Sequence, residues 1–283
     1  MRLVRFRHNG GIRHGQLTDG RILPFAEHVG PRPFLVQGPL ALKLRSTGDG
    51  STSIDLDEVE LLPPIADPSK ILCVGLNYHE HVQETGRTPA GYPTIFTRFA
   101  DTQLGHGQAI VAPPESDKVD YEAELAVIIG KPGRRISESA AMDHVGGYAC
   151  YNDVSIRDWQ KHGAQWTPGK NFPATGPFGP WIVTADELGD PTNLTIEARL
   201  NGQTVQKAST SQLIFSIAHL IAYISKFTPL NTGDVICTGT PGGVGFARNP
   251  PLFMKPGDVV EIEIERIGVL RNPVVAEVVS THD

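Results

Sequence analysis

The sequence predicts an α+β protein that is mainly β. Glycine and proline are abundant, with 30 and 23 residues in a chain of 283, which suits many strands and turns more than a helical bundle. Short apolar runs alternate with Asn-Gly and Asp-Gly pairs, which are typical of β-hairpins. The length and the 40% of hydrophobic residues allow one large domain, or one large and one small, with a sizeable core.

A small N-terminal domain is expected over residues 1–65, and a larger one over residues 66–283. The first part contains short segments that are predicted to be strands at 3–6, 12–17 and 21–23 and a short helix at 40–44. A proline-rich stretch then marks the linker. We find no catalytic motif in this part, so a cap or dimerisation role is expected.

Composition excludes two classes of partner. The net charge is −6 and lysine and arginine form no cluster, which argues against nucleic acid. No apolar run approaches the roughly 20 residues of a membrane helix. Three widely spaced cysteines form no CxxC pair, and the N-terminus lacks the apolar segment of a signal peptide. A cytoplasmic protein with reduced thiols is therefore expected.

One acidic strand organises the chain. Residues 119–130 first alternate between apolar and acidic residues and then become continuously apolar, which predicts a strand entering the core. Side chains two residues apart share a strand face, so Asp120, Glu122 and Glu124 are expected on one side, roughly 6.5–7 Å apart. Such a row is either a solvated acidic face or a set of oxygen ligands for Mg, Mn or Ca.

A second candidate lies just before this strand. An apolar strand at 70–75 leads to Asn77, which is expected to cap a helix with Glu80 completing a capping box. His81 and Glu84 then share a helix face, and a carboxylate beside an imidazole can hold it as a general base. The alternative is an exposed polar helix. Glycine and proline follow, which suits a mobile lid.

Two further polar residues follow predicted core segments. Asp153 comes directly after the apolar run 145–151, where it is either a third oxygen ligand or an ordinary turn or helix cap. Lys170 stands alone among aromatic residues and prolines, and is suited to a substrate carboxylate or a metal-bound group. Arg98, on a predicted strand, faces either solvent or a carboxylate ligand.

The C-terminal third contains three patterns with structural readings. Ser209 or Ser211 is expected to cap a helix that runs to about Lys226. The glycine-rich loop at 239–245 lacks a Gly-Lys-Ser/Thr sequence, so its N–H groups are expected to line an anionic pocket rather than to bind a nucleotide. A second acidic row, at 261–265, is expected to be a solvated face.

Several of these motifs occur in one order between residues 70 and 275. They are Gly75-Leu76-Asn77-Tyr78 with His81 and Glu84, Asp120-Tyr121-Glu122-Ala123-Glu124-Leu125, Asn152-Asp153 with Arg157-Asp158, Gly169-Lys170, Thr238-Gly239-Thr240-Pro241 with Gly243-Val244-Gly245, and Leu270-Arg271-Asn272-Pro273. Together they resemble the fumarylacetoacetate hydrolase family, in its bacterial branch of acylpyruvases and 2-hydroxyhepta-2,4-diene-1,7-dioate isomerases. The N-terminal part resembles the small domain of many bacterial members.

The resemblance implies a mixed β-roll domain, a small N-terminal α/β domain and a homodimer. It also implies a divalent metal, usually Mg²⁺ with Mn²⁺ or Ca²⁺ as substitutes, held by Glu122, Glu124 and Asp153. His81 and Glu84 match a dyad on a mobile lid, and Lys170 matches a lysine near metal and substrate. The residues implied to contact substrate are Arg98, Gln160 and Thr240.

The function expected first is hydrolysis of a C–C bond in a 2,4-dioxo acid of the acylpyruvate type, giving pyruvate and a carboxylic acid. His81 would activate water while the metal acts as a Lewis acid. Oxaloacetate decarboxylation or hydroxymuconate-type isomerisation on the same site is the alternative. A ligand-binding protein without turnover is the third hypothesis.

Overall fold

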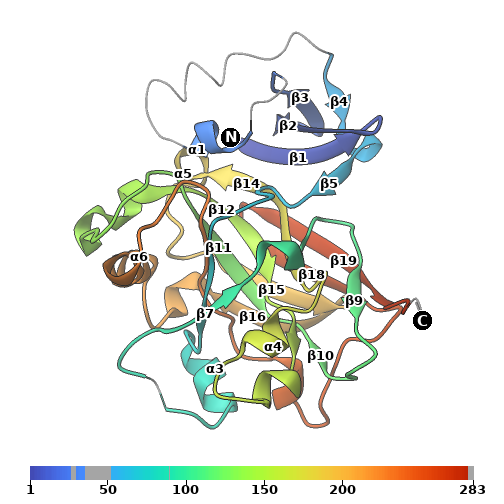
Figure 1. Ribbon diagram of the computed structural model, residues 1–283, viewed down its shortest axis with the longest axis vertical. Coiled ribbons are helices and arrows are strands. Elements are labelled where there is room, and N and C mark those ends of the chain that lie inside the picture. Colours follow the sequence, from blue (N-terminus) through green and yellow to red (C-terminus); the bar gives the residue numbers. More distant parts are fainter. Residues whose placement is uncertain (27–29, 36–51, 89, 280–283) are drawn as a thin grey trace.

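The computed structural model describes residues 1–26, 30–35, 52–88 and 90–279 (Figure 1). Strands of the largest sheet are β1 (Arg2–His8), β2 (Gly11–Thr18), β3 (Arg21–Pro24), β4 (Ile54–Asp55), β5 (Glu60–Leu62), β6 (Ile71–Gly75), β7 (Thr94–Arg98), β8 (Gln103–Leu104), β11 (Ala123–Ile129), β12 (Val145–Asn152), β14 (Gly176–Thr184) and β17 (Val235–Cys237). A second sheet contains β9 (Ile110–Ala112), β15 (Thr195–Leu200), β16 (Gln203–Ser209), β18 (Val259–Ile264) and β19 (Gly268–Ala276). A small ribbon pairs β10 (Val119–Asp120) with β13 (Ser155–Ile156).

Helices are short apart from one. The α-helices are α1 (Arg32–Leu35), α3 (His79–Glu84), α4 (Thr167–Lys170), α5 (Ala185–Leu188) and α6 (Ile217–Phe227). The 3₁₀ helices are η1 (Leu56–Glu58), η2 (Ala100–Thr102), η3 (Glu138–His144), η4 (Trp159–Lys161), η5 (Thr210–Gln212) and η6 (Gly245–Ala247). The prediction of a mainly β protein is confirmed. Among the described residues, no helix has the length and apolar character needed to cross a membrane.

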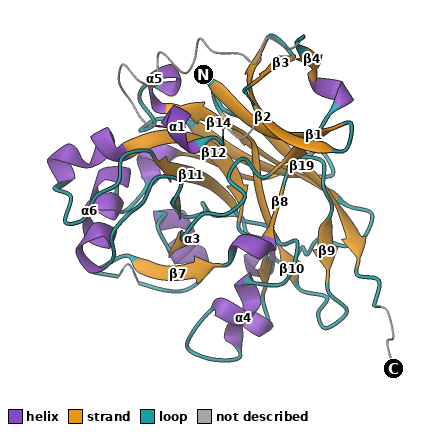
Figure 2. Ribbon diagram, turned by 45° about the horizontal axis from the view of Figure 1, so that its top comes forward, coloured by secondary structure: helices purple, strands orange, loops and turns teal. Residues whose placement is uncertain are grey.

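The two larger sheets pack face to face, as Figure 2 shows. The central strands β11, β12 and β14 contact β15, β18 and β19. Successive side chains of β11 enter different cores, with Leu125 and Val127 in the core between the sheets and Ala126 and Ile128 in the core on the other face. Because both faces are covered, the apolar run that ends the acidic segment is continuous rather than alternating.

The N-terminal strands extend the largest sheet. The three predicted strands are present as β1, β2 and β3, and β1 pairs antiparallel with β14 through Arg2 and Leu3. The large sheet therefore continues across the expected domain boundary, and the division at residue 65 stays a prediction. The helix expected at 40–44 lies outside the described residues.

Two predicted helix starts are wrong. Asn77 caps no helix, because its side chain bonds to backbone groups of Phe215 and Thr238, and α3 begins at His79 without a side-chain cap. Ser209 caps only the short η5, and Ser216 caps α6. The Asn77 side chain bonds to segments far away in the sequence, whereas Ser209 and Ser216 each cap the helix that directly follows them.

Candidate functional site: a buried carboxylate cluster beside a histidine–glutamate pair

Three buried carboxylates meet where β11 begins and β12 ends. These strands are antiparallel, with Ala123 opposite Asn152, so Glu122 and Glu124 lie beside Asp153. The Asp153 N–H donates to the Glu122 carbonyl at 3.0 Å. One oxygen from each of the three carboxylates lies within 4.8 Å of the others. Antiparallel pairing thus assembles residues about 30 positions apart in the sequence into one cluster.

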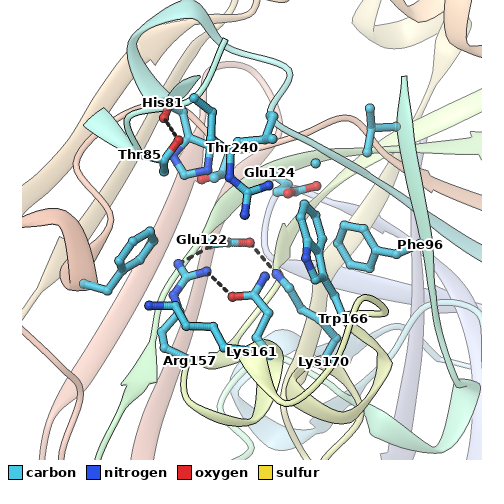
Figure 3. A pocket seen from close by; sticks show the side chains of 17 residues that line it. His81, Thr85, Phe96, Glu122, Glu124, Arg157, Lys161, Trp166, Lys170 and Thr240 are labelled. Carbon is cyan, nitrogen blue, oxygen red and sulfur yellow. Dashed lines mark hydrogen bonds and ion pairs between the residues drawn. The ribbon is translucent and has the colours of Figure 1, made fainter. Parts of the chain in front are cut away.

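Two buried cations bind this cluster from opposite sides of Glu122 (Figure 3). Lys170 Nζ lies 2.6 Å from both Glu122 Oε2 and Asp153 Oδ2. Arg157 Nη2 lies 2.8 Å from Glu122 Oε1. Burial alone would raise the pKa of Glu122, but the charges of Lys170 and Arg157 lower it below its ordinary value. Burial alone would lower the pKa of the Lys170 ammonium group, but the negative charges of Asp153 and Glu122 raise it above the ordinary value.

Arg98 and Asp120 lie behind the cluster. Arg98 Nη1 donates to Asp153 Oδ1 at 2.6 Å and Nη2 donates to Thr175 at 2.7 Å. The Arg98 residue is only 3% exposed and is absent from the lining of the cavity. Asp120 was expected on the same strand face as the two glutamates, but the strand is interrupted after β10, and Asp120 instead accepts from Arg157 Nε at 2.7 Å. Both residues orient cluster members through ion pairs.

The cluster fits a hard divalent cation. Four buried carboxylates face three buried cations; they are Asp120, Glu122, Glu124 and Asp153 against Arg98, Arg157 and Lys170. Among the described residues, the hydrogen-bond partner of the Glu124 carboxylate is the Gly239 N–H, at 3.0 Å. Burial and the neighbouring charges of Asp153 and Glu122 raise its pKa well above the ordinary value. Three carboxylate oxygens with excess negative charge are ligands that Mg²⁺, Mn²⁺ or Ca²⁺ prefers.

The glycine-rich loop after β17 binds carboxylates of the protein itself. Its N–H groups donate from Gly239 to Glu124 at 3.0 Å, from Gly243 to Glu84 at 2.8 Å and from Gly245 to Asp120 at 2.7 Å. A Cβ atom on Gly243 would lie 2.3 Å from the carbonyl oxygen of Val205, and its φ of +102° favours glycine. These amides were expected to line an anionic ligand pocket, and that expectation is wrong for them: they fix three side chains of the site.

His81 and Glu84 form a close pair on α3. His81 Nδ1 lies 2.7 Å from Glu84 Oε1, and the other Glu84 oxygen accepts the Gly243 N–H. Since an ionised carboxylate can only accept, Nδ1 carries the proton and Nε2 is the free basic nitrogen. His81 is only 6% exposed. The i and i+3 spacing on α3 therefore produces the contact that it predicts.

One cavity of about 360 Å³ joins the pair to the cluster. Its lining includes His81, Glu122, Glu124, Lys170, Gln160 and Thr240. Gln160 Oε1 accepts from Arg157 at 3.1 Å, and Thr240 Oγ1 accepts from Gln206 at 2.8 Å. A basic nitrogen, carboxylate oxygens and an ammonium group thus border one small volume, which suits proton transfer on an acidic ligand.

Sequence reasoning missed part of the lining. Arg157 belongs to one of the motifs but has no predicted role, although it follows Asp153 by four residues and bonds to Glu122 of the cluster and to Asp120 behind it. Phe96 and Trp166 form an aromatic wall, with ring centroids 5.2 Å apart. A Cβ atom on Gly75 would lie 2.3 Å from the Trp166 ring, so a glycine at this strand end permits the wall. No local spacing connects these two aromatic residues.

Comparisons with known proteins identify relatives that cover most of the chain. The chain is 47% identical to oxaloacetate tautomerase fahd2, mitochondrial, of Xenopus laevis over 86% of this chain and 78% of the relative. It is 45% identical to oxaloacetate tautomerase FAHD2A, mitochondrial, of Homo sapiens over the same shares. The crystal structure of 2-hydroxyhepta-2,4-diene-1,7-dioate isomerase from Mycobacterium marinum has a TM-score of 0.80 and 36% identity, covering 98% of this chain and 99% of that one.

A second solved structure and two family profiles complete the comparison. Fumarylacetoacetate hydrolase from Exiguobacterium antarcticum has a TM-score of 0.86 and 35% identity, and covers 98% of this chain and 100% of that one. Residues 1–64 match the profile described as Rv2993c-like, N-terminal. Residues 70–275 match fumarylacetoacetate (FAA) hydrolase, C-terminal. The protein therefore belongs to the fumarylacetoacetate hydrolase family, whose fold it shares and whose enzymes usually use a divalent metal.

Proposed function

We propose that this protein is a metal-dependent enzyme that interconverts the keto and enol forms of oxaloacetate or a closely related 2-oxo dicarboxylic acid. One observation supports this most strongly: a free histidine nitrogen borders the same small cavity as the carboxylate cluster. The identity of 44–47% to relatives named oxaloacetate tautomerase supports the choice of substrate. Tautomerisation needs a base and a group that stabilises the oxygen of the enolate, and residues that line the cavity supply both.

The reaction moves one proton and breaks no carbon–carbon bond. His81 Nε2 takes a proton from C3 of the keto acid, while Glu84 holds the ring and stabilises its positive charge. The electron pair of the C–H bond forms the C2–C3 double bond, and negative charge moves to the C2 oxygen. Lys170 and the Thr240 hydroxyl offset that charge, and the imidazolium returns the proton to oxygen.

The metal site has a defined part in this scheme. Glu122, Glu124 and Asp153 would hold a divalent cation, which supplies Lewis-acid polarisation of the 2-oxo group when bound. Arg98, from behind the cluster, and Arg157, from the cavity, keep these carboxylates in place. Gln160 reaches the cavity beside Arg157 and orients the acid end of the substrate.

Hydrolysis of an acylpyruvate is the second candidate. In this reaction the same His81 activates a water molecule, which attacks the 4-oxo carbon; the C3–C4 bond breaks and its electrons leave on pyruvate as the enolate. The aromatic wall of Phe96 and Trp166 favours this candidate, since it offers apolar surface for an acyl group. Decarboxylation of oxaloacetate would use the same enolate without a hydrolytic water.

The test compares substrates with the purified protein and Mg²⁺ or Mn²⁺. We expect faster decay of the enol absorbance of oxaloacetate than in the protein-free control, and loss of that effect with EDTA. Acetylpyruvate is assayed in parallel for pyruvate release, and CO₂ release is measured for oxaloacetate. Metal-dependent pyruvate release without tautomerisation would replace the first candidate by the second, and CO₂ release alone would indicate a decarboxylase.

His81→Ala tests the base. Because general-base catalysis contributes roughly 10²–10⁴-fold, we expect turnover to fall by that factor while metal affinity is unchanged. Calorimetric titration with Mn²⁺ measures the affinity. Full turnover in His81→Ala would remove the histidine–glutamate pair from the mechanism. The turnover of Glu84→Gln should lie between that of His81→Ala and that of the parent protein.

Location and assembly remain expectations. Cys73, Cys150 and Cys237 are free and buried, which suits the reducing compartment expected of a cytoplasmic protein. The homodimer implied by the family resemblance is tested by light scattering during size-exclusion chromatography at several protein concentrations. A single monomer mass at every concentration would contradict it.

A further inference from the structure

Two positive side chains of the cavity are not used by the carboxylate cluster. Arg87 follows α3, and its backbone N–H donates to Val82 at 3.1 Å. Lys161 ends η4, and its backbone N–H donates to Asp158 at 2.9 Å. Both side chains line the same cavity as Glu122 and Lys170, and both residues are exposed. Their backbones are fixed, although the charged ends reach solvent at the cavity mouth.

Each of these cations lies against an aromatic ring. The Arg87 guanidinium carbon lies 5.6 Å from the centroid of Trp166, and Lys161 Nζ lies 5.5 Å from that of Phe246. Within the described ranges, neither side chain makes an ion pair with an acidic residue. The face of an aromatic ring attracts a cation but leaves N–H groups of that cation without a hydrogen-bond acceptor. Arg87 and Lys161 therefore keep N–H donors for a ligand.

The inner cations differ in this respect. Lys170 and Arg157 are buried, and their charges are already shared with Glu122, Asp153 and Asp120. A second carboxylate of the substrate would have to compete with these partners for the N–H groups of Lys170 and Arg157. The buried cations at the inner end of the cavity are therefore paired with carboxylates of the protein, whereas Arg87 and Lys161 have no acidic partner among the described residues.

We propose that Arg87 and Lys161 select dicarboxylic 2-oxo acids by binding the carboxylate far from the metal cluster. This inference rests on the proposed function, in which the 2-oxo acid end of the substrate lies at the inner end. A four-carbon dicarboxylic acid fits a cavity of about 360 Å³. The outer carboxylate then lies between two cations on separate segments, one after α3 and one on η4. Monocarboxylic 2-oxo acids lack the group that these two residues bind.

The test measures binding without turnover. We use 3,3-difluoro-oxaloacetate, which has no proton on C3, and 3,3-difluoro-2-oxobutanoate, which has the same inner end but a methyl group in place of the outer carboxylate. Calorimetry with Mg²⁺-loaded protein gives both dissociation constants. In Arg87→Gln and in Lys161→Gln, we expect the dicarboxylate to bind roughly 10-fold more weakly, since each variant removes a charge-assisted hydrogen bond.

Control measurements separate the loss of a contact with the outer carboxylate from a general loss of electrostatic attraction for anions. The monocarboxylate should weaken by less than about threefold in both variants, as expected for screened long-range charge. Arg134→Gln, on an exposed residue outside the cavity lining, should leave both constants unchanged. Arg87→Lys should restore part of the lost affinity.

Two results would overturn the inference. Equal weakening of both ligands would show that the two cations only attract anions, and unchanged affinity for the dicarboxylate would show that they do not touch it. Either result leaves the proposed function intact. If both ligands bind with the expected difference but oxaloacetate is not converted, the proposed function fails and the selectivity of Arg87 and Lys161 stands.

Discussion

The chain contains two segments with alternating glutamates, and these glutamates are buried in one segment and partly exposed in the other. At the start of β11, the Glu122 side chain is 6% exposed and bonds to a buried lysine and a buried arginine. On β18, the side chains of Glu261 and Glu263 are 23% and 46% exposed and pair with Arg199. The alternation places acids on one face in both strands. Only the surroundings of that face decide whether it becomes a candidate metal site or a solvated ion-pair network.

The two regions differ because the acids at β11 are buried and their negative charge is not fully compensated. On β18 water screens the glutamates, so their mutual repulsion costs little. At β11 the sheet and the glycine-rich loop exclude water, and Glu124 is left with a pKa well above its ordinary value because of burial and neighbouring charge. A cation is the simplest way to relieve that excess. The same pattern thus becomes functional only where solvent is removed.

The sharpest test exchanges one acid in each strand. Glu124→Gln can still accept the Gly239 N–H but loses a charged metal ligand. We expect turnover to fall by at least about 10³-fold, since a metal contributes several kcal/mol to stabilising developing charge. Glu263→Gln, the matched control, should change turnover by less than about twofold. Mn²⁺ titration of both variants measures binding, and parental affinity in Glu124→Gln would refute the cluster as the metal site.

The second test removes the arginine partner in each region. Arg98→Met leaves Asp153 buried beside fewer positive charges, and breaking a buried pair costs about 3–5 kcal/mol. Arg199→Met removes a partly exposed partner of Glu261 and Glu263 and should cost less than about 1 kcal/mol. Urea unfolding in EDTA measures both free energies. Equal costs would mean that burial does not separate the two networks.

The third test uses pH. The folded pKa of Glu124 is raised above 4.5, so without metal its contribution to stability is present at low pH and is lost as pH rises through the folded value. Metal binding must displace the proton, and affinity should increase up to about tenfold per pH unit while Glu124 is protonated. Calorimetry in buffers of different ionisation enthalpy measures the proton released. If Glu124→Gln released as many protons on metal binding as the parent protein, the displaced proton would belong to another group.

Much of the candidate site follows from sequence because its chemistry is local. The spacing of His81 and Glu84 on a helix, and of Glu122 and Glu124 along one chain segment, determines which side chains share a face. Asp153 was open between a ligand and a turn residue on spacing alone, and antiparallel pairing brings it to the glutamates. The family resemblance implies the same assignment.

Other features depend on contacts between distant segments. Asn77 has the spacing of a helix cap but bonds to Phe215 and Thr238, about 140 and 160 residues away. The sequence leaves open whether Arg98 faces solvent or a carboxylate ligand, and in the structure it is buried against Asp153. The partners of such side chains are set by which strands pair, and local propensity does not specify that.

The sequence by itself determined the mainly β class, the strands bounded by Asn-Gly and Asp-Gly turns, and the residue types available for acid–base and metal chemistry. These depend on backbone preferences and side-chain periodicity, which act over a few residues. Only the tertiary structure decided which cations pair with the buried acids and that glycine-loop amides hold Glu84, Asp120 and Glu124. The reason is that burial and charge compensation are properties of packed segments far apart in the chain.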